Sequence, residues 1–138
     1  MTPSQIEIVK DSFQNISPLG DALSQTFYEE LFRIAPSVRP YFPQDMEEQR
    51  TKLTETLGAL VLHLHQMYLL GDTITGLARR HVDYGARPEH FPPVGHALIH
   101  ALDKHSPGGL TPLEMDGWAA AYGEITDLMI EAMITYAA

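Results

Sequence analysis

The chain has 138 residues, 44% of them hydrophobic and 20% charged, which suits one globular domain spanning residues 1–138 with a single core. A net charge of −9 argues against nucleic acid and anionic membrane surfaces as partners, and the lack of cysteine excludes disulfides, thiolate metal sites and cysteine nucleophiles. The first residues carry no export signal, and no apolar run approaches the roughly 20 residues that span a bilayer. We therefore expect a cytoplasmic protein without a membrane span.

Helical periodicity dominates the first third of the chain. Thr2, Pro3 and Gln5 together form a capping box with proline at the first helical position, which predicts a helix beginning there. Apolar residues at four-residue steps then predict a second helix that runs to about Ile34. Three prolines within residues 35–43 predict a sharp, irregular corner after it.

The remaining pattern predicts four further helices. A long helix should run from about Met46 to about Tyr68, and a shorter one containing His81 should follow it. A proline-rich turn at residues 86–93 precedes the next helix, and a second capping box at Thr111 opens the last one. Six helices with bent corners fit a simple up-down bundle poorly, so the pattern favours crossed helices packed around something central.

One histidine lies within an apolar helical stripe. Ile74, Leu77, His81 and Tyr84 are spaced three, four and three apart, which places them on one helix face. A buried imidazole needs a hydrogen-bond partner or a metal, because an unpaired buried polar group costs a few kcal/mol. From the spacing alone, a core histidine bonded to a nearby carbonyl is the more common outcome and metal ligation the rarer one.

Other polar residues carry weaker signals. His96 and His100 have a spacing that can hold zinc, but no carboxylate follows at a matching spacing. Gln49 shares an apolar face with Leu53, where a polar side chain is either a packing exception or a donor to a ligand. Zinc-protease, phosphate-loop and nucleophile-elbow motifs are all absent.

Four stretches in collinear order resemble the bacterial single-domain globins and the globin portion of flavohaemoglobins. They are FYEELFRIAPSVRPYF (27–42), QRTKL (49–53), RRHVDYG with HFPPVG (79–95) and WAAAYG (118–123). The resemblance implies an all-α globin fold, a three-on-three helical sandwich around haem b (iron protoporphyrin IX). Haem, an apolar disc with one charged edge, also suits the apolar stripes around His81 and Leu53.

The resemblance also implies roles for individual residues. His81 would be the proximal iron ligand, Tyr28 and Gln49 the distal polar pair, and Leu53 the distal apolar wall. Further haem-binding residues, with Lys52 and Arg80 as candidates for the propionates, would be Phe42, Lys52, Leu57, Leu77, Arg80, Tyr84, Phe91, Val94, Leu98 and Tyr122.

The chain departs from the family on the proximal side. Many members tie the proximal histidine to a tyrosine and a glutamate, whereas Phe91 and Met133 stand at those positions here. We therefore expect His81 to donate to a backbone carbonyl one turn back, such as that of Leu77. A less anionic imidazole favours reversible ligand binding over peroxidase-like chemistry.

The expected function is reversible, high-affinity oxygen binding, as in oxygen transport, with other small ligands such as nitric oxide also bound. The alternative is a nitric oxide dioxygenase, which needs a separate reductase, because flavohaemoglobins carry their own flavin and nicotinamide domain and this sequence shows none. A haem-based sensor usually needs an attached output domain, and a haem-free helical interaction module is the remaining possibility.

Overall fold

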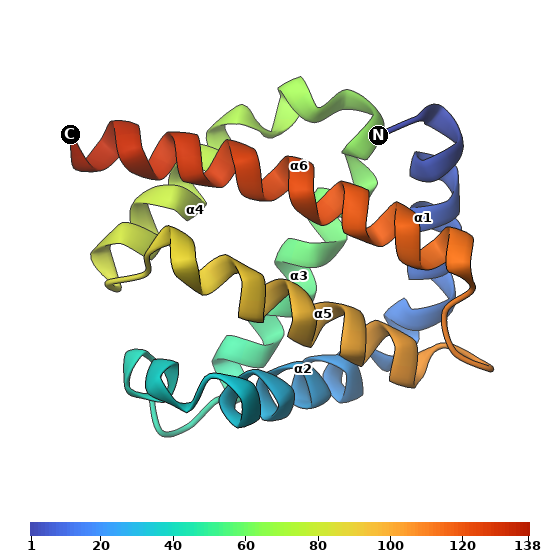
Figure 1. Cartoon of the computed structure of the whole chain (residues 1–138), viewed down its shortest axis with the longest axis horizontal. Helices are drawn as coiled ribbons and strands as arrows, with labels where there is room; N and C mark the ends of the chain where they lie inside the picture. The colour runs from blue at the N-terminus through green and yellow to red at the C-terminus, as the bar shows by residue number, and fades with distance from the viewer.

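The computed structural model describes all 138 residues and contains helices but no strands (Figure 1). The α-helices and the short 3₁₀ helices between them are α1 (Pro3–Ile16), η1 (Ser17–Leu19), α2 (Gly20–Ile34), η2 (Pro36–Tyr41), α3 (Glu47–Leu62), η3 (Leu64–Leu70), α4 (Gly71–Asp83), η4 (Pro88–His90), α5 (Phe91–His105) and α6 (Pro112–Ala137). Helices α5 and α6 cross the front of the molecule, and α3 runs behind them (Figure 1). No helix combines the length and hydropathy that crossing a membrane requires.

Both predicted capping boxes are present. The Thr2 hydroxyl accepts from the backbone N–H of Gln5 at 3.1 Å, and the Gln5 side chain accepts from the backbone N–H of Thr2 at 2.9 Å. Thr111 and Glu114 repeat the arrangement at the start of α6, at 3.1 and 2.9 Å. These bonds satisfy N–H groups that the first helical turn leaves without partners.

The predicted long helix from Met46 to Tyr68 is wrong in its last turns. α3 ends at Leu62, and the following segment is a 3₁₀ helix with a non-helical residue at Gln66 (φ −138°, ψ 56°). Leu64 and Leu70 are both buried, but in two different hydrophobic clusters. The chain bends so that both leucines reach their clusters, and tertiary packing therefore overrides the helical pattern.

The hydrophobic interior consists of those two clusters. The larger one joins α1, α2, α5 and the first half of α6, and the smaller one lies where α4 packs on the second half of α6. Trp118 is 2% exposed, and its indole N–H donates to the Ser12 hydroxyl at 3.0 Å across the α1–α6 contact. This bond satisfies the polar atom of the largest side chain in the core.

Helices α2 and α3 approach each other closely at Gly20. The Thr54 hydroxyl lies 3.1 Å from the Gly20 carbonyl oxygen, to which it donates, and 2.9 Å from the Ser24 hydroxyl. A Cβ atom at position 20 would lie only 2.6 Å from Thr54 Cγ2. The missing side chain therefore allows this crossing, which also brings Tyr28 of α2 and Gln49 of α3 together.

Candidate functional site

His81 lies near the end of α4 with its imidazole half-buried. Its Nδ1 lies 2.7 Å from the carbonyl oxygen of Leu77, one turn back in the same helix, as the sequence predicted. Because a carbonyl only accepts, Nδ1 carries the proton and donates. Nε2 forms no hydrogen bond, so its lone pair is free. Burial lowers the pKa of His81, which favours the neutral imidazole that a metal ion requires.

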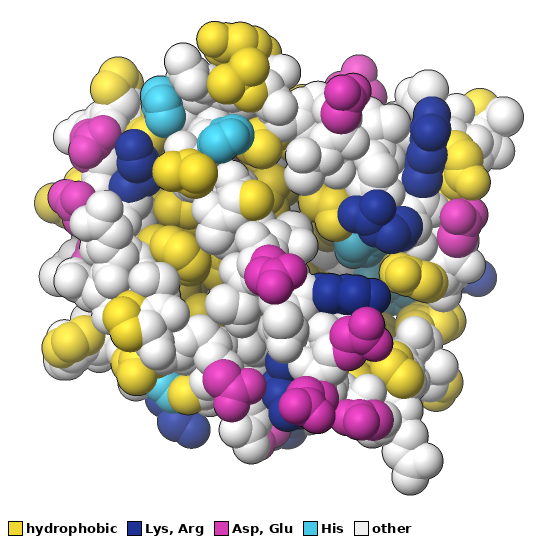
Figure 2. Space-filling view, turned by 180° about the vertical axis from the view of Figure 1, so that it is seen from behind, with side chains coloured by type: hydrophobic (Ala, Val, Ile, Leu, Met, Phe, Trp, Pro, Cys, Tyr) yellow, Lys and Arg dark blue, Asp and Glu magenta, His cyan; other side chains and the backbone are white.

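The imidazole borders a cavity of about 310 Å³ that also receives side chains from η2, α3 and α5. Of the predicted haem-binding residues, those lining this cavity are Phe42, Gln49, Lys52, His81, Tyr84, Phe91 and Val94. On the side of the molecule hidden in Figure 1, Lys and Arg side chains flank a hollow with histidine inside it (Figure 2). Lys52 and Arg87 are the exposed cations that line the cavity.

A second cavity of about 140 Å³ lies deeper, and Val94 lines both. Thirteen residues line it and twelve are hydrophobic, among them the predicted Leu53, Leu57, Leu98 and Tyr122. We refer to these two neighbouring cavities together as the slot, with the outer cavity as its polar mouth and the second cavity as its apolar inner end.

Tyr28 and Gln49 are joined by a hydrogen bond. Gln49 Nε2 donates to the Tyr28 hydroxyl oxygen at 3.1 Å, and the phenol is only 6% exposed. Burial raises the pKa of Tyr28, so the phenol is protonated at neutral pH. Since its oxygen accepts from Gln49, its own proton remains available for another acceptor.

Four of the predicted residues lie differently from the expectation. Tyr28 lines neither cavity and is joined to the outer one through its hydrogen bond with Gln49. The Arg80 side chain is exposed and lines neither cavity, and Leu77 also lines neither but packs on the smaller hydrophobic cluster. Tyr84 was expected on the buried stripe but is 58% exposed, because α4 ends at Asp83 and Tyr84 stands at the mouth.

Sequence reasoning missed Arg87 and His90 as residues of the mouth. Both line the outer cavity from the turn before α5, where His90 Nδ1 accepts from the Arg87 backbone N–H at 3.0 Å. Their positions in a proline-rich turn gave no periodic signal that they would face the site. The order of the segments could have suggested it, because this turn connects the helix of His81 to the helix of Val94.

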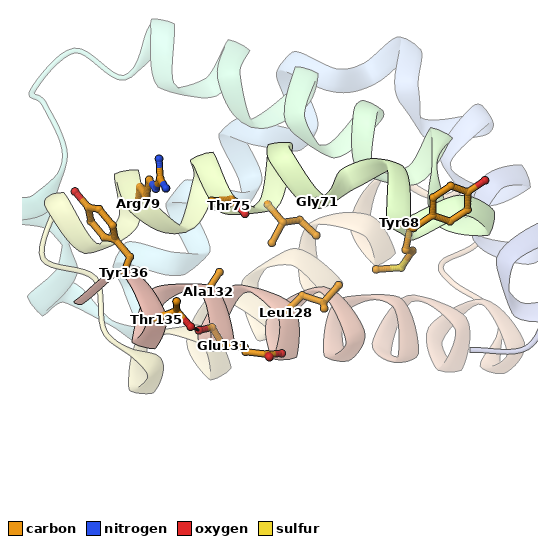
Figure 3. Close-up of a pocket in the computed structure, with 11 residues that line it drawn as sticks. Tyr68, Gly71, Thr75, Arg79, Leu128, Glu131, Ala132, Thr135 and Tyr136 are labelled. Atoms are coloured by element: carbon orange, nitrogen blue, oxygen red, sulfur yellow. Dashed lines mark hydrogen bonds between the residues drawn. The ribbon is translucent and has the colours of Figure 1, made fainter. Parts of the chain in front are cut away.

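A larger groove of about 740 Å³ lies on the other face of α4, between α4 and α6 (Figure 3). Thr75 and Arg79 line it from α4, with Glu131 and Tyr136 opposite them on α6. It is open to solvent and excludes His81, which lies about half a turn from Arg79 around the helix. We therefore take the smaller slot as the functional site, because the predicted residues converge there.

The spacing of His96 and His100 does not lead to a zinc site in the structure. His100 Nε2 lies 3.2 Å from Glu30 Oε2. No group of three potential ligands among His, Asp and Glu comes close enough to hold a metal ion.

Comparison with known proteins decides the family. The family model described as Globin matches residues 25–129, which include Tyr28, Gln49 and His81. The chain belongs to the globin family. The expectation of an all-helical globin fold is confirmed, because a bacterial globin structure from Campylobacter jejuni matches with a TM-score of 0.89 at 25% identity, covering 98% of each chain.

The similar curated proteins are larger. A flavohemoprotein from Deinococcus radiodurans is 34% identical over 94% of this chain, and one from Vibrio cholerae is 28% identical over 95%. The chain spans about a third of the length of these relatives, 33% and 34% respectively. Membership of the globin family implies that the protein binds haem and, through it, small diatomic ligands.

The slot of this globin suits haem. The apolar inner end matches the body of the porphyrin, and the cations at the mouth match its charged edge. His81 offers a neutral imidazole whose Nδ1 is already bonded and whose Nε2 is free, the arrangement that metal-binding histidines adopt.

Proposed function

We propose that this globin holds haem b on His81 and binds oxygen reversibly and with high affinity, with Tyr28 and Gln49 as the donors that retain it. One observation carries the proposal. His81 and Gln49 line the same cavity, and Gln49 donates to Tyr28, which lies directly behind it. This arrangement supports a single site with an imidazole on one side and two polar donors on the other.

Haem held on His81 would supply an iron centre for a diatomic ligand, and a donor near that centre would stabilise the partial negative charge of oxygen. Gln49 orients the phenol of Tyr28 by donating to its oxygen, which leaves the phenolic proton to donate to the ligand. The hydroxyl of Tyr28 is largely shielded from water. The residue is 6% exposed and packs against the rings of Phe27, Phe32 and Phe42. The oriented hydroxyl and its shielding from water both favour retention of oxygen over a less polar ligand such as carbon monoxide.

The surroundings of His81 support binding rather than peroxidase-like chemistry. Its Nδ1 donates to a neutral backbone carbonyl and not to a carboxylate. Met133 is 4% exposed and belongs to the smaller cluster, which is apolar, and Phe91 packs against that cluster. A neutral acceptor leaves the imidazole less anionic, so it gives less electron density to the iron.

The experiment is the absorbance spectrum of purified protein reconstituted with haem. The wild type should show an intense Soret band, and His81→Ala should lose or shift it because the axial nitrogen is gone. His65→Ala removes an exposed imidazole outside the slot and serves as the matched control. An identical spectrum in wild type and His81→Ala would overturn the assignment of the ligand.

A second candidate is nitric oxide dioxygenase, favoured by the similarity to proteins named flavohemoproteins. In that reaction nitric oxide, dioxygen and one electron give nitrate, so a reductase must supply the electron. Nitric oxide consumption is measured with and without an added reductase and its nicotinamide cofactor. Sustained nitrate formation far above the rate of autoxidation supports the enzyme, and a single turnover supports the binding protein.

A further inference from the structure

We propose that Tyr122 is a positioning residue for His81, acting through Phe91. The inference rests on the proposed function, because it concerns how the imidazole that would hold the iron is kept in orientation. Tyr122 belongs to α6, Phe91 begins α5 and His81 lies near the end of α4, so the contact links three helices.

The first contact joins Tyr122 to the backbone of Phe91. The Tyr122 hydroxyl donates to the Phe91 carbonyl oxygen at 2.6 Å, a short bond in a partly buried setting. The phenol ring lies directly on Gly95, where an added Cβ would be 2.6 Å from Tyr122 Cε2. A glycine at this position lets the ring approach the first turn of α5 closely. The ring and the hydroxyl together fix that turn against α6.

The second contact joins Phe91 to the imidazole. The two rings stack with their planes 17° apart and their centroids 6.3 Å apart. The hydrogen bond from Nδ1 to Leu77 fixes one atom of the imidazole, but the ring can still rock about that bond. The nearly parallel ring of Phe91 limits this motion, because rocking would bring the edge of the imidazole against the phenyl ring.

No polar partner from α6 reaches His81 directly. The α6 residues of the smaller cluster include Met129 and Met133, both 4% exposed, which offer no charged acceptor. The restraint from α6 therefore passes through the backbone of Phe91. Loss of the Tyr122 hydroxyl should therefore loosen the imidazole of His81, although the two groups are not in contact.

The test uses resonance Raman spectra of the haem-loaded ferrous protein, in which the iron–histidine stretching band reports the imidazole. Tyr122→Phe deletes the hydroxyl and keeps the ring on Gly95, and we expect the band to broaden and shift from its wild-type position. Phe91→Leu removes the aromatic ring beside the imidazole and should broaden the band at least as much. In the double variant, Tyr122→Phe should add nothing, since its effect passes through Phe91.

Tyr136→Phe is the matched control. Like Tyr122→Phe, it removes a tyrosine hydroxyl of α6 that bonds to another helix. The Tyr136 hydroxyl lies on the exposed surface and donates to Asp83 Oδ1 of α4 at 3.1 Å. We expect no change of the band in this variant. Equal broadening in Tyr136→Phe, an unchanged band in Tyr122→Phe, or additive effects in the double variant would each overturn the inference.

These outcomes are separate from failure of the proposed function. A wild-type protein without an iron–histidine band, or His81→Ala with an unchanged Soret band, would remove the haem assignment itself. A normal band in the wild type that Tyr122→Phe leaves unaltered would remove only the positioning role.

Discussion

The hydroxyl of Tyr28 is the single group on which oxygen retention should depend most. Its oxygen is occupied by Gln49 at 3.1 Å, and its side chain is buried, so its proton has few competitors for the ligand. Hydrogen bonds to acceptors carrying charge contribute roughly 1.5–3 kcal/mol. This range corresponds to a factor of about ten to a hundred in a dissociation constant.

Replacement of Tyr28 by phenylalanine should therefore accelerate oxygen dissociation by about ten- to a hundredfold. Stopped-flow displacement of oxygen measures the rate directly. Carbon monoxide provides the control within the same variant, because it develops little negative charge and should dissociate at nearly the wild-type rate. An oxygen dissociation rate equal to that of the wild type would rule out this role for the phenol.

Residue-level prediction succeeded where the partner lies close along the chain. The bond from His81 to the Leu77 carbonyl follows from helix geometry, because a residue four positions back is one turn away. The Tyr28–Gln49 pair followed from the resemblance, and the structure brings the two side chains together. The bond from Tyr122 to Phe91 spans 31 residues and depends on how α5 and α6 cross, which no local pattern encodes.

At the scale of helices, the crossing of α2 and α3 at Gly20 sets the distance between the two distal donors. Thr54 is β-branched and stiff, and its hydroxyl bonds to the Gly20 carbonyl at 3.1 Å and to the Arg50 carbonyl at 3.2 Å. It therefore has little room to yield to a larger side chain at position 20. The small residue at the crossing is a requirement of packing.

Gly20→Ala should lower the free energy of unfolding by about 1–3 kcal/mol, because its methyl group would overlap Thr54 Cγ2. Gly71→Ala is the matched control, since α4 begins there and nothing lies within 4 Å of the added Cβ. That control should be neutral or more stable, by up to ~1 kcal/mol. Urea unfolding of both variants measures the difference, and equal stability would contradict a tight crossing.

Prediction of the helices themselves was reliable where caps and prolines mark their ends, as at Thr2 and Thr111. It failed after Leu62, because Leu64 and Leu70, which lie on either side of the bend, belong to two different clusters. A periodic pattern identifies which residues will be buried. It does not show whether they will be buried against the same neighbour.

At the scale of the whole molecule, the contact of α2 with α5 contains the carboxylate of Glu30, which is 7% exposed. Arg33 donates to Glu30 Oε1 through Nε at 2.8 Å and through Nη2, and His100 Nε2 lies 3.2 Å from Oε2. The hydrogen bonds from Arg33, assisted by the charges of His100, Arg33 and His96, lower the pKa of Glu30 below its ordinary value of 4.5.

A carboxyl whose pKa is lower in the folded state stabilises the fold above its ordinary pKa, and this contribution disappears as the pH falls. Wild type should therefore melt at a higher temperature than Glu30→Gln near pH 7, and the gap should close as the pH falls below 4.5. Glu29→Gln, at an exposed neighbouring position, should show no such gap. Thermal melts across this pH range measure the effect, and a gap independent of pH would contradict it.

The chain contains one tryptophan, and Trp118 lines the inner cavity while its indole stays bonded to Ser12. Porphyrins absorb in the region where indoles emit, so a macrocycle in the slot would quench this fluorophore by energy transfer. The fold thus provides an intrinsic optical reporter at the inner end of its own site. Loading of the apoprotein can be titrated through its ultraviolet emission, without a dye, a label or any engineered residue.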